Sequence, residues 1–481
     1  MLFNSIQFAV FLPIVFILYW FVFKRLKLQN LFVLIASYIF YGWWDWRFLI
    51  LIAITSGCSY WSGLLIQQKE GDRKAQKWIC AGNITLNLLI LATFKYLNFF
   101  VENFVGLLAF FNVELDWVTL KIILPVGISF YTFQALSYTI DVYRGKLTPT
   151  RDVVAFFAFI SFFPQLVAGP IERATNLLPQ FLKSRSFDYD KAVDGCRQML
   201  WGFFKKIVIA DNCAIYVDQV FGNYMNESGS TLLLAAVLFT FQIYGDFSGY
   251  SDIAIGTGKL FGINLMRNFN YPYFSRDIAE FWRRWHISLT TWFRDYIYIP
   301  LGGSRTTKWK VIRNTFIIFL VSGFWHGANW TFIAWGTYHA LLFLPLILTR
   351  KNRKYMDVVA AGKVFPSIKE LFQMLLTFSF VVVGWIIFRS DTIGDALLYI
   401  KKMFCCQLLS IPYLINREYY LPLFCCILVM LLTEWLQRTQ QHALNISFIK
   451  SHVVKYVIYY AIVLLLFFFG GKSESFIYFQ F

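Results

Sequence analysis

Long apolar runs recur along the whole 481-residue chain, and they constrain its fold more than any other feature. A helix that crosses a bilayer needs roughly 20 predominantly apolar residues. We therefore expect an all-α polytopic membrane protein with about 10–12 spans, of which the shorter ones are re-entrant or tilted. The candidate spans are Ile6–Phe23, Leu31–Trp44, Phe48–Ile66, Trp78–Phe94, Ile122–Ile140, Val153–Ala168, Thr231–Ile255, Thr315–Trp330, Phe332–Leu348, Phe372–Phe388, Leu421–Trp435 and Val453–Phe469.

Hydrophobic residues make up 58% of the chain and charged residues only 15%, whereas a soluble protein of this length needs a more polar surface. Aromatic residues make up 20%, which suits the aromatic belts of the two membrane interfaces. These values exclude a disordered protein, a secreted disulfide scaffold and an ordinary cytosolic enzyme. Barrel strands alternate in and out, so continuous apolar runs also disfavour an outer-membrane barrel. No polar stretch is long enough to fold alone, and we expect one integral-membrane domain over residues 1–481.

The net charge is +17, from 44 Lys and Arg residues against 27 Asp and Glu residues. In a membrane protein this excess indicates basic loops that stay in the cytoplasm, so nucleic-acid binding is not expected. The loops after the first, third and fifth candidate spans are basic, whereas the loop around Glu102 and Glu114 is acidic. This asymmetry predicts that Met1 lies outside the cell and that the basic loops lie in the cytoplasm.

A basic amphipathic segment over residues 276–313 contains the sequence F-W-R-R-W-H-I-S-L-T-T-W-F-R-D-Y. At 100° per residue, Arg276–Tyr296 places an aromatic and aliphatic stripe on one side and arginines on the other, which predicts an amphipathic helix in the cytoplasmic interface. His286 lies at the edge of the apolar stripe. Two interpretations of the arginines stand. They contact lipid headgroups, or the cluster with Arg283 and Arg284 binds the phosphates of a cytosolic donor such as acyl-coenzyme A.

The segment Ser322–Gly336 carries a histidine inside an apolar run. If a span begins near Asn314, His326 lies roughly 18 Å into a membrane core of about 30 Å. An ionisable side chain at that depth is a functional candidate, although a histidine that hydrogen-bonds a neighbouring helix is the structural alternative. His326 could take the proton of an acceptor hydroxyl or carry an acyl group itself. Trp325 and Asn329 are predicted to contact the substrate or orient the imidazole.

Two carboxylates, Asp246 and Asp252, lie inside the apolar segment Gln242–Gly256 and need partners such as arginines or hydroxyls. Three glycines in the same segment predict a broken or closely packed helix. No further ligand cluster supports metal binding, and the eight cysteines form no zinc-ligand pattern, so no metal site is expected. We assign the two carboxylates a structural or site-orienting role and keep them as candidates for substrate contact.

The C-terminal segment Phe476–Phe481 reads F-I-Y-F-Q-F, and Tyr478 carries its only hydroxyl. Such a tail could enter a cavity, or it could anchor the chain at the membrane surface. The residues alone do not separate these two interpretations.

Together these segments resemble the membrane-bound O-acyltransferase (MBOAT) family, and above all its bacterial branch that O-acetylates alginate or peptidoglycan. The resemblance runs from M-L-F-N-S-I-Q-F-A-V-F-L-P through P-V-G-I-S-F-Y-T-F-Q, F-P-Q-L-V-A-G-P-I, D-F-S-G-Y-S-D, F-W-R-R-W-H-I-S-L-T-T-W-F-R-D-Y-I-Y-I-P-L-G-G and S-G-F-W-H-G-A-N-W to F-I-Y-F-Q-F. It implies a ring of tilted helices around a funnel. Catalytic His326 would lie at the buried end of the funnel, and a second catalytic histidine, His286, nearer its cytoplasmic mouth.

The resemblance also implies an activity and its partners. A multi-pass protein of the bacterial inner membrane, surrounded by lipid and without a bound cofactor, would take an acetyl group from acetyl-coenzyme A or another cytosolic thioester. Tyr478 would relay the acyl group, and a separate extracytoplasmic transferase of the SGNH-hydrolase type would place it on a polysaccharide. Transfer of D-alanine or another acyl group is an alternative. A transporter or a scaffold without covalent chemistry is another, although the chain lacks the internal duplication of many transporters.

Overall fold

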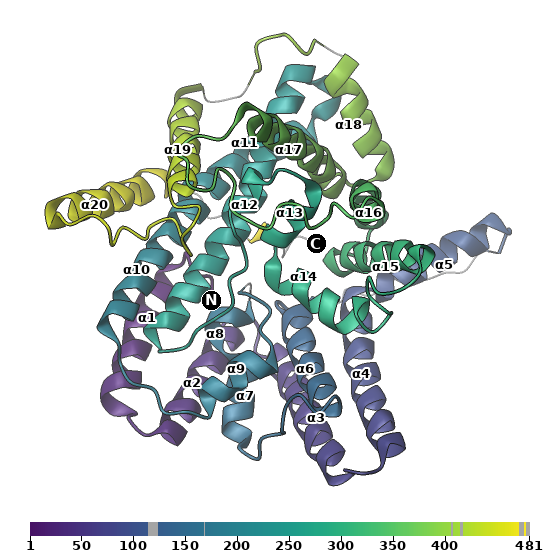
Figure 1. Cartoon of the computed structure of the whole chain (residues 1–481), viewed down its shortest axis with the longest axis vertical. Coiled ribbons are helices and arrows are strands. Elements are labelled where there is room, and N and C mark those ends of the chain that lie inside the picture. Colours follow the sequence, from purple (N-terminus) through teal and green to yellow (C-terminus); the bar gives the residue numbers. More distant parts are fainter. Residues whose placement is uncertain (114–123, 168, 406, 414–416, 471–475, 478–481) are drawn as a thin grey trace. The chain divides into compact units, whose positions relative to one another are not determined.

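The computed structural model describes residues 1–113, 124–167, 169–405, 407–413, 417–470 and 476–477, and over these residues all regular structure is helical. By their contacts the described residues divide into two compact units, and Figure 1 labels most of their helices. Unit 1 comprises Met1–Ala192 and Thr257–Met266, and unit 2 comprises Val193–Gly256 and Arg267–Phe481. The predicted all-α architecture is confirmed. The prediction of one integral-membrane domain, and of a ring of helices around a funnel, stays a prediction.

Unit 1 is built from the N-terminal helices of the chain. Its elements are α1 (Ile6–Ile17), η1 (Leu18–Val22), α2 (Leu26–Gly42), α3 (Phe48–Gln68), α4 (Arg73–Lys95), α5 (Leu97–Phe110), α6 (Ile128–Tyr143), α7 (Val153–Ser161), α8 (Phe163–Leu166) and α9 (Ala174–Phe181).

Helices α3, α4 and α6 pack together around a small buried polar cluster. Asn83 of α4 accepts a hydrogen bond at 2.9 Å from the hydroxyl of Thr139 on α6, and it donates one at 3.3 Å to Ser59 of α3. Polar side chains of this kind connect helices where the surroundings are otherwise apolar. They fix which faces of the three helices meet.

The predicted span Val153–Ala168 is wrong, because the helix ends after nine residues. Helix α7 stops at Ser161, Phe162 is extended with φ −52° and ψ 110°, and the four-residue α8 begins at Phe163. In a continuing helix Pro164 would lack the N–H that bonds the carbonyl of Ile160 and its ring would clash with that carbonyl, whereas in the first turn of α8 neither problem arises. Hydropathy alone did not register this interruption.

Unit 2 contains the rest of the chain, and two of its helices begin or end in unit 1. Its elements are α10 (Tyr189–Phe203), η2 (Phe204–Ala210), α11 (Asp211–Gly222), η3 (Tyr224–Asn226), α12 (Gly229–Leu260), η4 (Pro272–Phe274), α13 (Ile278–Arg284), α14 (Ile287–Phe293), η5 (Arg294–Tyr298), α15 (Lys308–His326), α16 (Trp330–Leu348), α17 (Ile368–Arg389), α18 (Ile393–Cys405), α19 (Arg417–Leu436) and α20 (His452–Phe469).

Helix α12 is the long buried element of unit 2, and it is continuous through the glycines of Gln242–Gly256. A Cβ atom on Gly249 would lie 2.8 Å from the carbonyl oxygen of Gly202, and one on Gly256 would lie 2.5 Å from that of Gly195. The glycines therefore allow α10 and α12 to approach closely. Of the two predicted alternatives, the structure shows the closely packed helix and not the broken one.

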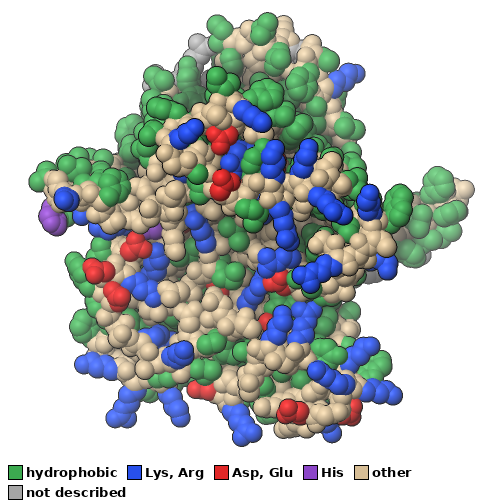
Figure 2. All heavy atoms as spheres, viewed as in Figure 1, with side chains coloured by type: hydrophobic (Ala, Val, Ile, Leu, Met, Phe, Trp, Pro, Cys, Tyr) green, Lys and Arg blue, Asp and Glu red, His purple; other side chains and the backbone are tan. Residues whose placement is uncertain are grey.

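Six described helices are long and apolar enough to cross a membrane, namely α3, α4, α12, α16, α17 and α20, and four shorter apolar helices accompany them. Figure 2 shows mainly apolar side chains on α5 and α20, as lipid contact requires. Figure 2 also shows Lys and Arg side chains at the end of unit 1 where Figure 1 places the α3–α4 loop. The chain is a multi-pass membrane protein, and the span count of about 10–12 stays a prediction.

Candidate active site

A break in the amphipathic segment places His286 in the interior of unit 2. Helix α13 ends at Arg284, Trp285 is extended, and His286 adopts the left-handed conformation with φ 44° and ψ 54° before α14 begins at Ile287. The predicted continuous helix over Arg276–Tyr296 is therefore wrong. A left-handed residue with a side chain costs about 1–2 kcal/mol. Other contacts must hold the break in place.

Those contacts come from the segment just before α13. The backbone N–H of Ile287 donates to the carbonyl of Asn268 at 2.8 Å, and the N–H of Asn270 donates to the carbonyl of Arg284 at 2.9 Å. The two segments thus satisfy backbone groups that a helix would have satisfied internally. His286 is left facing inward with 1% of its surface exposed.

Arg276 and the two arginines of α13 are bound within the protein and do not form the open cationic face that periodicity predicted. Arg276 and Arg284 both pair with Glu280, at 3.0 and 2.8 Å, and all three side chains are buried. Arg283 donates to the backbone carbonyls of Asn352 and Tyr355, each at 2.6 Å. The segment is consequently fixed to the loop that follows α16.

Among the described residues the imidazole of His286 makes one polar contact, and aromatic rings pack against it. Its Nδ1 lies 3.0 Å from Oδ1 of Asn268, and its Nε2 has no hydrogen-bond partner among the described residues. The rings of Phe247 and Trp325 lie 4.6 and 5.9 Å from the imidazole, centroid to centroid. Burial lowers the pKa of His286 to about 3, so the ring is uncharged at neutral pH.

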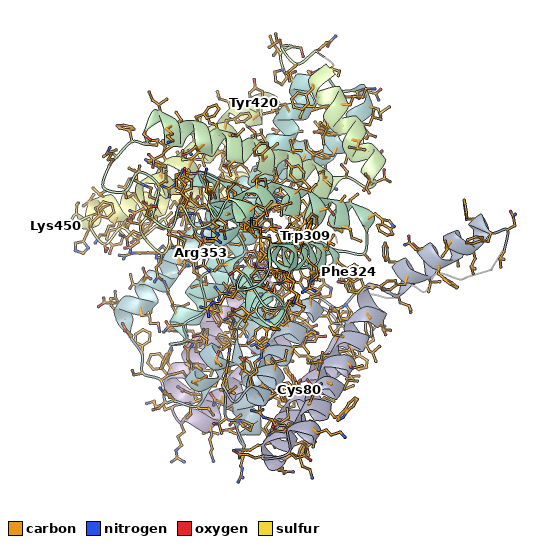
Figure 3. The ribbon with its side chains drawn as sticks, turned by 45° about the vertical axis from the view of Figure 1, so that its right-hand side comes forward. Cys80, Trp309, Phe324, Arg353, Tyr420 and Lys450 are labelled. Carbon is orange, nitrogen blue, oxygen red and sulfur yellow. The ribbon has the colours of Figure 1, made fainter. Side chains whose placement is uncertain are left out.

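A cavity of about 480 Å³ opens beside both predicted histidines. Its walls are mostly aromatic and aliphatic, and its polar lining includes His286, His326, Ser322 and Thr290. Three arginines also line it, Arg283, Arg294 and the exposed Arg353, which Figure 3 labels. A cavity of this size accommodates a small-molecule ligand or the arm of a larger one.

His326 lies at the C-terminal end of α15, not inside a longer span as predicted. Gly327 is extended after it, and Asn329 begins α16 by accepting a hydrogen bond from the N–H of Thr331 at 3.0 Å. The Trp325 ring contacts the imidazoles of both His326 and His286, at 5.0 and 5.9 Å. Trp325 therefore packs against both histidines, while the side chain of Asn329 caps a helix and donates to the carbonyl of Asp391.

Both carboxylates of α12 are neutralised by lysines of η2, and not by the arginines or hydroxyls expected. Lys206 pairs with Asp246 and with Asp211, each at 2.7 Å, and Lys205 pairs with Asp252 at 2.6 Å. Among the described residues that line the cavity, neither aspartate appears, and neither does Arg284. Substrate contact by these three residues stays a prediction.

The two described residues of the C-terminal segment are buried in unit 2. Phe476 is 0% exposed and Ile477 is 2% exposed, and the Phe476 ring packs on Tyr250 and Phe247 at 4.4 and 5.8 Å. Phe247 in turn contacts His286. These two residues lie inside the protein and not at the membrane surface. Tyr478 lies outside the described residues.

Comparison with known proteins decides the family. The profile of MBOAT, the membrane-bound O-acyltransferase family, matches residues 149–383. A probable alginate O-acetylase, AlgI, of Pseudomonas aeruginosa is 43% identical over 406 residues, which is 84% of this chain and 75% of that protein. The chain belongs to the MBOAT family. It is an O-acyltransferase.

Two further relatives show the range of this MBOAT protein's similarity. A peptidoglycan O-acetyltransferase of Helicobacter pylori is 35% identical over 437 residues, which is 84% of this chain and 80% of that protein. A teichoic acid D-alanyltransferase of Bacillus subtilis is 30% identical over 285 residues, which is 55% of this chain and 68% of that protein. The family match at 149–383 includes both histidines and both α12 aspartates.

Sequence reasoning brought His286 and His326 to one site, but it missed three side chains of this MBOAT protein that the structure adds. Asn268 contacts His286, Arg353 lines the cavity, and Lys206 neutralises Asp246. Basic residues inside the run F-F-K-K-I-V-I-A were a usable signal for a buried ion pair. Asn268 gave none, because a single asparagine in a loop has no pattern.

Proposed function

We propose that this MBOAT protein takes an acetyl group from acetyl-coenzyme A in the cytosol for O-acetylation of an extracytoplasmic polysaccharide, either an alginate-like exopolysaccharide or peptidoglycan. The observation that carries the proposal is the cavity into which His286 and His326 both project, with arginines in its lining. Imidazole is the side chain best matched to proton transfer near neutral pH. Apolar walls exclude the water that would otherwise hydrolyse the thioester.

The arginines that line the cavity would bind the phosphates of the donor. Arg283 already donates to two backbone carbonyls, and Arg294 pairs with Asp295 at 2.7 Å. Arg353 is exposed and has no ion pair among the described residues. We therefore assign Arg353 as the phosphate contact of coenzyme A, since guanidinium groups bind phosphate with two parallel hydrogen bonds.

The transfer step balances without a cofactor. The oxygen of an acceptor hydroxyl attacks the thioester carbonyl, its proton passes to an imidazole, the C–S bond breaks, and the thiol leaves with a proton. His326 is the residue that takes the proton or carries the acyl group. Placing thioester and hydroxyl side by side in one cavity supplies much of the remaining rate.

The relatives support acetate as the cargo. The proteins that match over more than four fifths of this chain are named as an alginate O-acetylase and a peptidoglycan O-acetyltransferase, at 43% and 35% identity. The D-alanyltransferase matches over only 55% of this chain. We therefore prefer acetyl over D-alanyl transfer.

Export requires a route across the membrane and a partner outside. We propose an inner-membrane location with the basic loops of unit 1 in the cytoplasm, where the positive-inside rule places them. Phe476 and Ile477 are buried, and the Phe476 ring contacts Phe247, which in turn contacts His286. Tyr478, the proposed acyl relay, is the next residue in the sequence. An extracytoplasmic transferase of the SGNH-hydrolase type would then complete the reaction.

The deciding experiment measures alkali-releasable acetate on surface polysaccharide. A deletion strain is complemented with native protein, with His326→Ala, or with His339→Leu, which alters a buried histidine that does not line the cavity. We expect acetate with native protein and His339→Leu but not with His326→Ala at matched membrane levels. Equal acetate from His326→Ala would refute the catalytic role.

A purified-protein assay separates an enzyme from a transporter or scaffold. Native protein in nanodiscs is given acetyl-coenzyme A labelled in the acetyl group. An enzyme releases or transfers labelled acetate in a His326-dependent manner. Neither a transporter nor a scaffold cleaves the thioester.

A further inference from the structure

Asn268 forms hydrogen bonds to the break between α13 and α14 with its side chain as well as its backbone. Its Oδ1 lies 3.0 Å from Nδ1 of His286, 2.9 Å from the hydroxyl of Ser288 and 3.4 Å from the backbone N–H of Ser288. Its Nδ2 donates to the hydroxyl of Ser251 on α12 at 3.0 Å. The carboxamide is 0% exposed, so these protein groups take the place of water.

This arrangement determines the tautomer of His286. A backbone N–H can only donate, so the Asn268 atom that faces the Ser288 N–H must be the carbonyl oxygen. The Nδ1 of His286 faces the same oxygen and must therefore carry the ring proton. The lone pair of the neutral ring is then on Nε2, the buried atom that lacks a described partner, on a residue that lines the cavity.

We propose that Asn268 is a positioning residue that holds His286 as the Nδ1–H tautomer, so that Nε2 serves as an uncharged hydrogen-bond acceptor for an N–H or O–H group of the ligand in the cavity. The ligand part of this inference rests on the proposed function. Two sources of that group exist: an amide N–H of the pantetheine arm of the thioester donor, and the O–H of the acyl acceptor.

The chemistry of the site gives the two histidines different roles. Because burial lowers the pKa of His286 to about 3, this ring is a poor proton carrier near neutral pH and a good fixed acceptor. The rings packed on it, Phe247, Phe269 and Trp325, do not titrate. His286 therefore orients the ligand, and proton or acyl transfer is left to His326.

The first test reads the tautomer directly. The chain has five histidines, so ¹⁵N-histidine labelling of the protein in lipid gives few signals, and His286→Gln identifies those of His286 by difference. Native protein should show a protonated Nδ1 and a lone-pair Nε2. Asn268→Asp keeps an acceptor and should retain this pattern, whereas Asn268→Leu should lose it. A protonated Nε2 in the native protein would overturn the proposal.

The second test separates the two sources of the hydrogen bond. Binding of a non-hydrolysable acetyl-coenzyme A analogue, with acceptor absent, is compared between native protein, Asn268→Asp and Asn268→Leu. If Asn268→Leu raises the dissociation constant of the analogue roughly tenfold and Asn268→Asp binds it as tightly as native protein, the donor's amide is the source of the hydrogen bond. Unchanged binding with a lower kcat for acetyl transfer identifies the acceptor hydroxyl. If neither quantity changes, the proposal fails.

A control keeps loss of folding apart from loss of positioning. Asn83→Leu removes another buried, hydrogen-bonded asparagine, which belongs to unit 1 and does not line the cavity. It should leave the His286 signals unchanged. Native protein that bound the analogue but never transferred acetyl would refute the proposed function, while an altered tautomer in Asn268→Leu would still support the positioning role.

Discussion

The backbone N–H of Ile477 donates a hydrogen bond to Oδ2 of Asp246 at 2.6 Å, although 231 positions separate the two residues. The other oxygen of Asp246 pairs with the ammonium group of Lys206. One buried carboxylate thus holds the C-terminal segment against α12 and at the same time neutralises a buried cation. Substitution of Asp246 should therefore affect both the fold and the tail.

Replacing Asp246 should destabilise the protein and uncouple the tail. Removal of one partner from a buried ion pair costs about 3–5 kcal/mol, so Asp246→Ala should lower the thermal midpoint of purified protein strongly. Asp246→Asn keeps an oxygen acceptor and should be milder. The tail is tested by deleting residues 476–481 and measuring the decrease in thermal midpoint. This decrease should be smaller in Asp246→Asn than in the native background, because the substitution and the deletion remove the same contact.

Asp252→Asn is the matched control for the tail experiment. Asp252 lies on the same helix and pairs with Lys205, and its described hydrogen-bond partners do not include the tail. Deletion of residues 476–481 should lower the thermal midpoint as much in Asp252→Asn as in the native protein. Equal costs in all three backgrounds would contradict the anchoring role of Asp246.

Arg353→Ala should raise the KM for acetyl-coenzyme A about fivefold and leave kcat unchanged, because an exposed phosphate contact of about 1 kcal/mol is made equally in the ground and transition states. The effect should shrink as ionic strength rises. Steady-state kinetics in nanodiscs at low and high salt measure this. Arg305→Ala, an exposed arginine that does not line the cavity, should behave like native protein.

The backbone at His286 should make the stability of its variants depend on tolerance of positive φ. Asparagine enters the left-handed region more readily than a β-branched residue, so His286→Asn should be more stable than His286→Val by about 1 kcal/mol. Thermal midpoints of the two purified variants check the order. At His339, which lies inside α16, the same pair of substitutions should differ little. A similar gap at both positions would point to polarity and not to backbone strain.

Stability should fall on acidification in a way that depends on His286. The folded-state pKa of this histidine is lowered to about 3, below the unfolded value of about 6.5, so the unfolded state binds more protons at acidic pH. The contribution is present above pH 6.5 and is lost as pH falls toward 3. Between pH 7.5 and pH 5, native protein should lose about 2 kcal/mol more than His286→Asn. Identical pH profiles of the midpoint would contradict this.

The position of His326 illustrates how far hydropathy and motif reasoning reach. The apolar run predicted a helix that contains His326, and this histidine is indeed the last residue of α15. The end of that helix at His326 depends on Gly327 and on the cap that Asn329 provides for α16, which are local signals within the sequence. Periodicity over the longer run concealed them, because both helices are apolar.

The sequence by itself determined the all-helical membrane architecture, the family and the two histidines, because hydropathy and motif order are properties of contiguous residues. Only the tertiary structure decided where the helix breaks at His286, which lysines neutralise Asp246 and Asp252, and that Phe476 and Ile477 are buried. Each of these depends on a hydrogen bond or ion pair from a segment distant along the chain. The 100° periodicity of a helix records which side chains share a face, but it carries no information on backbone groups that Asn268 and Asn270 bind from outside that helix.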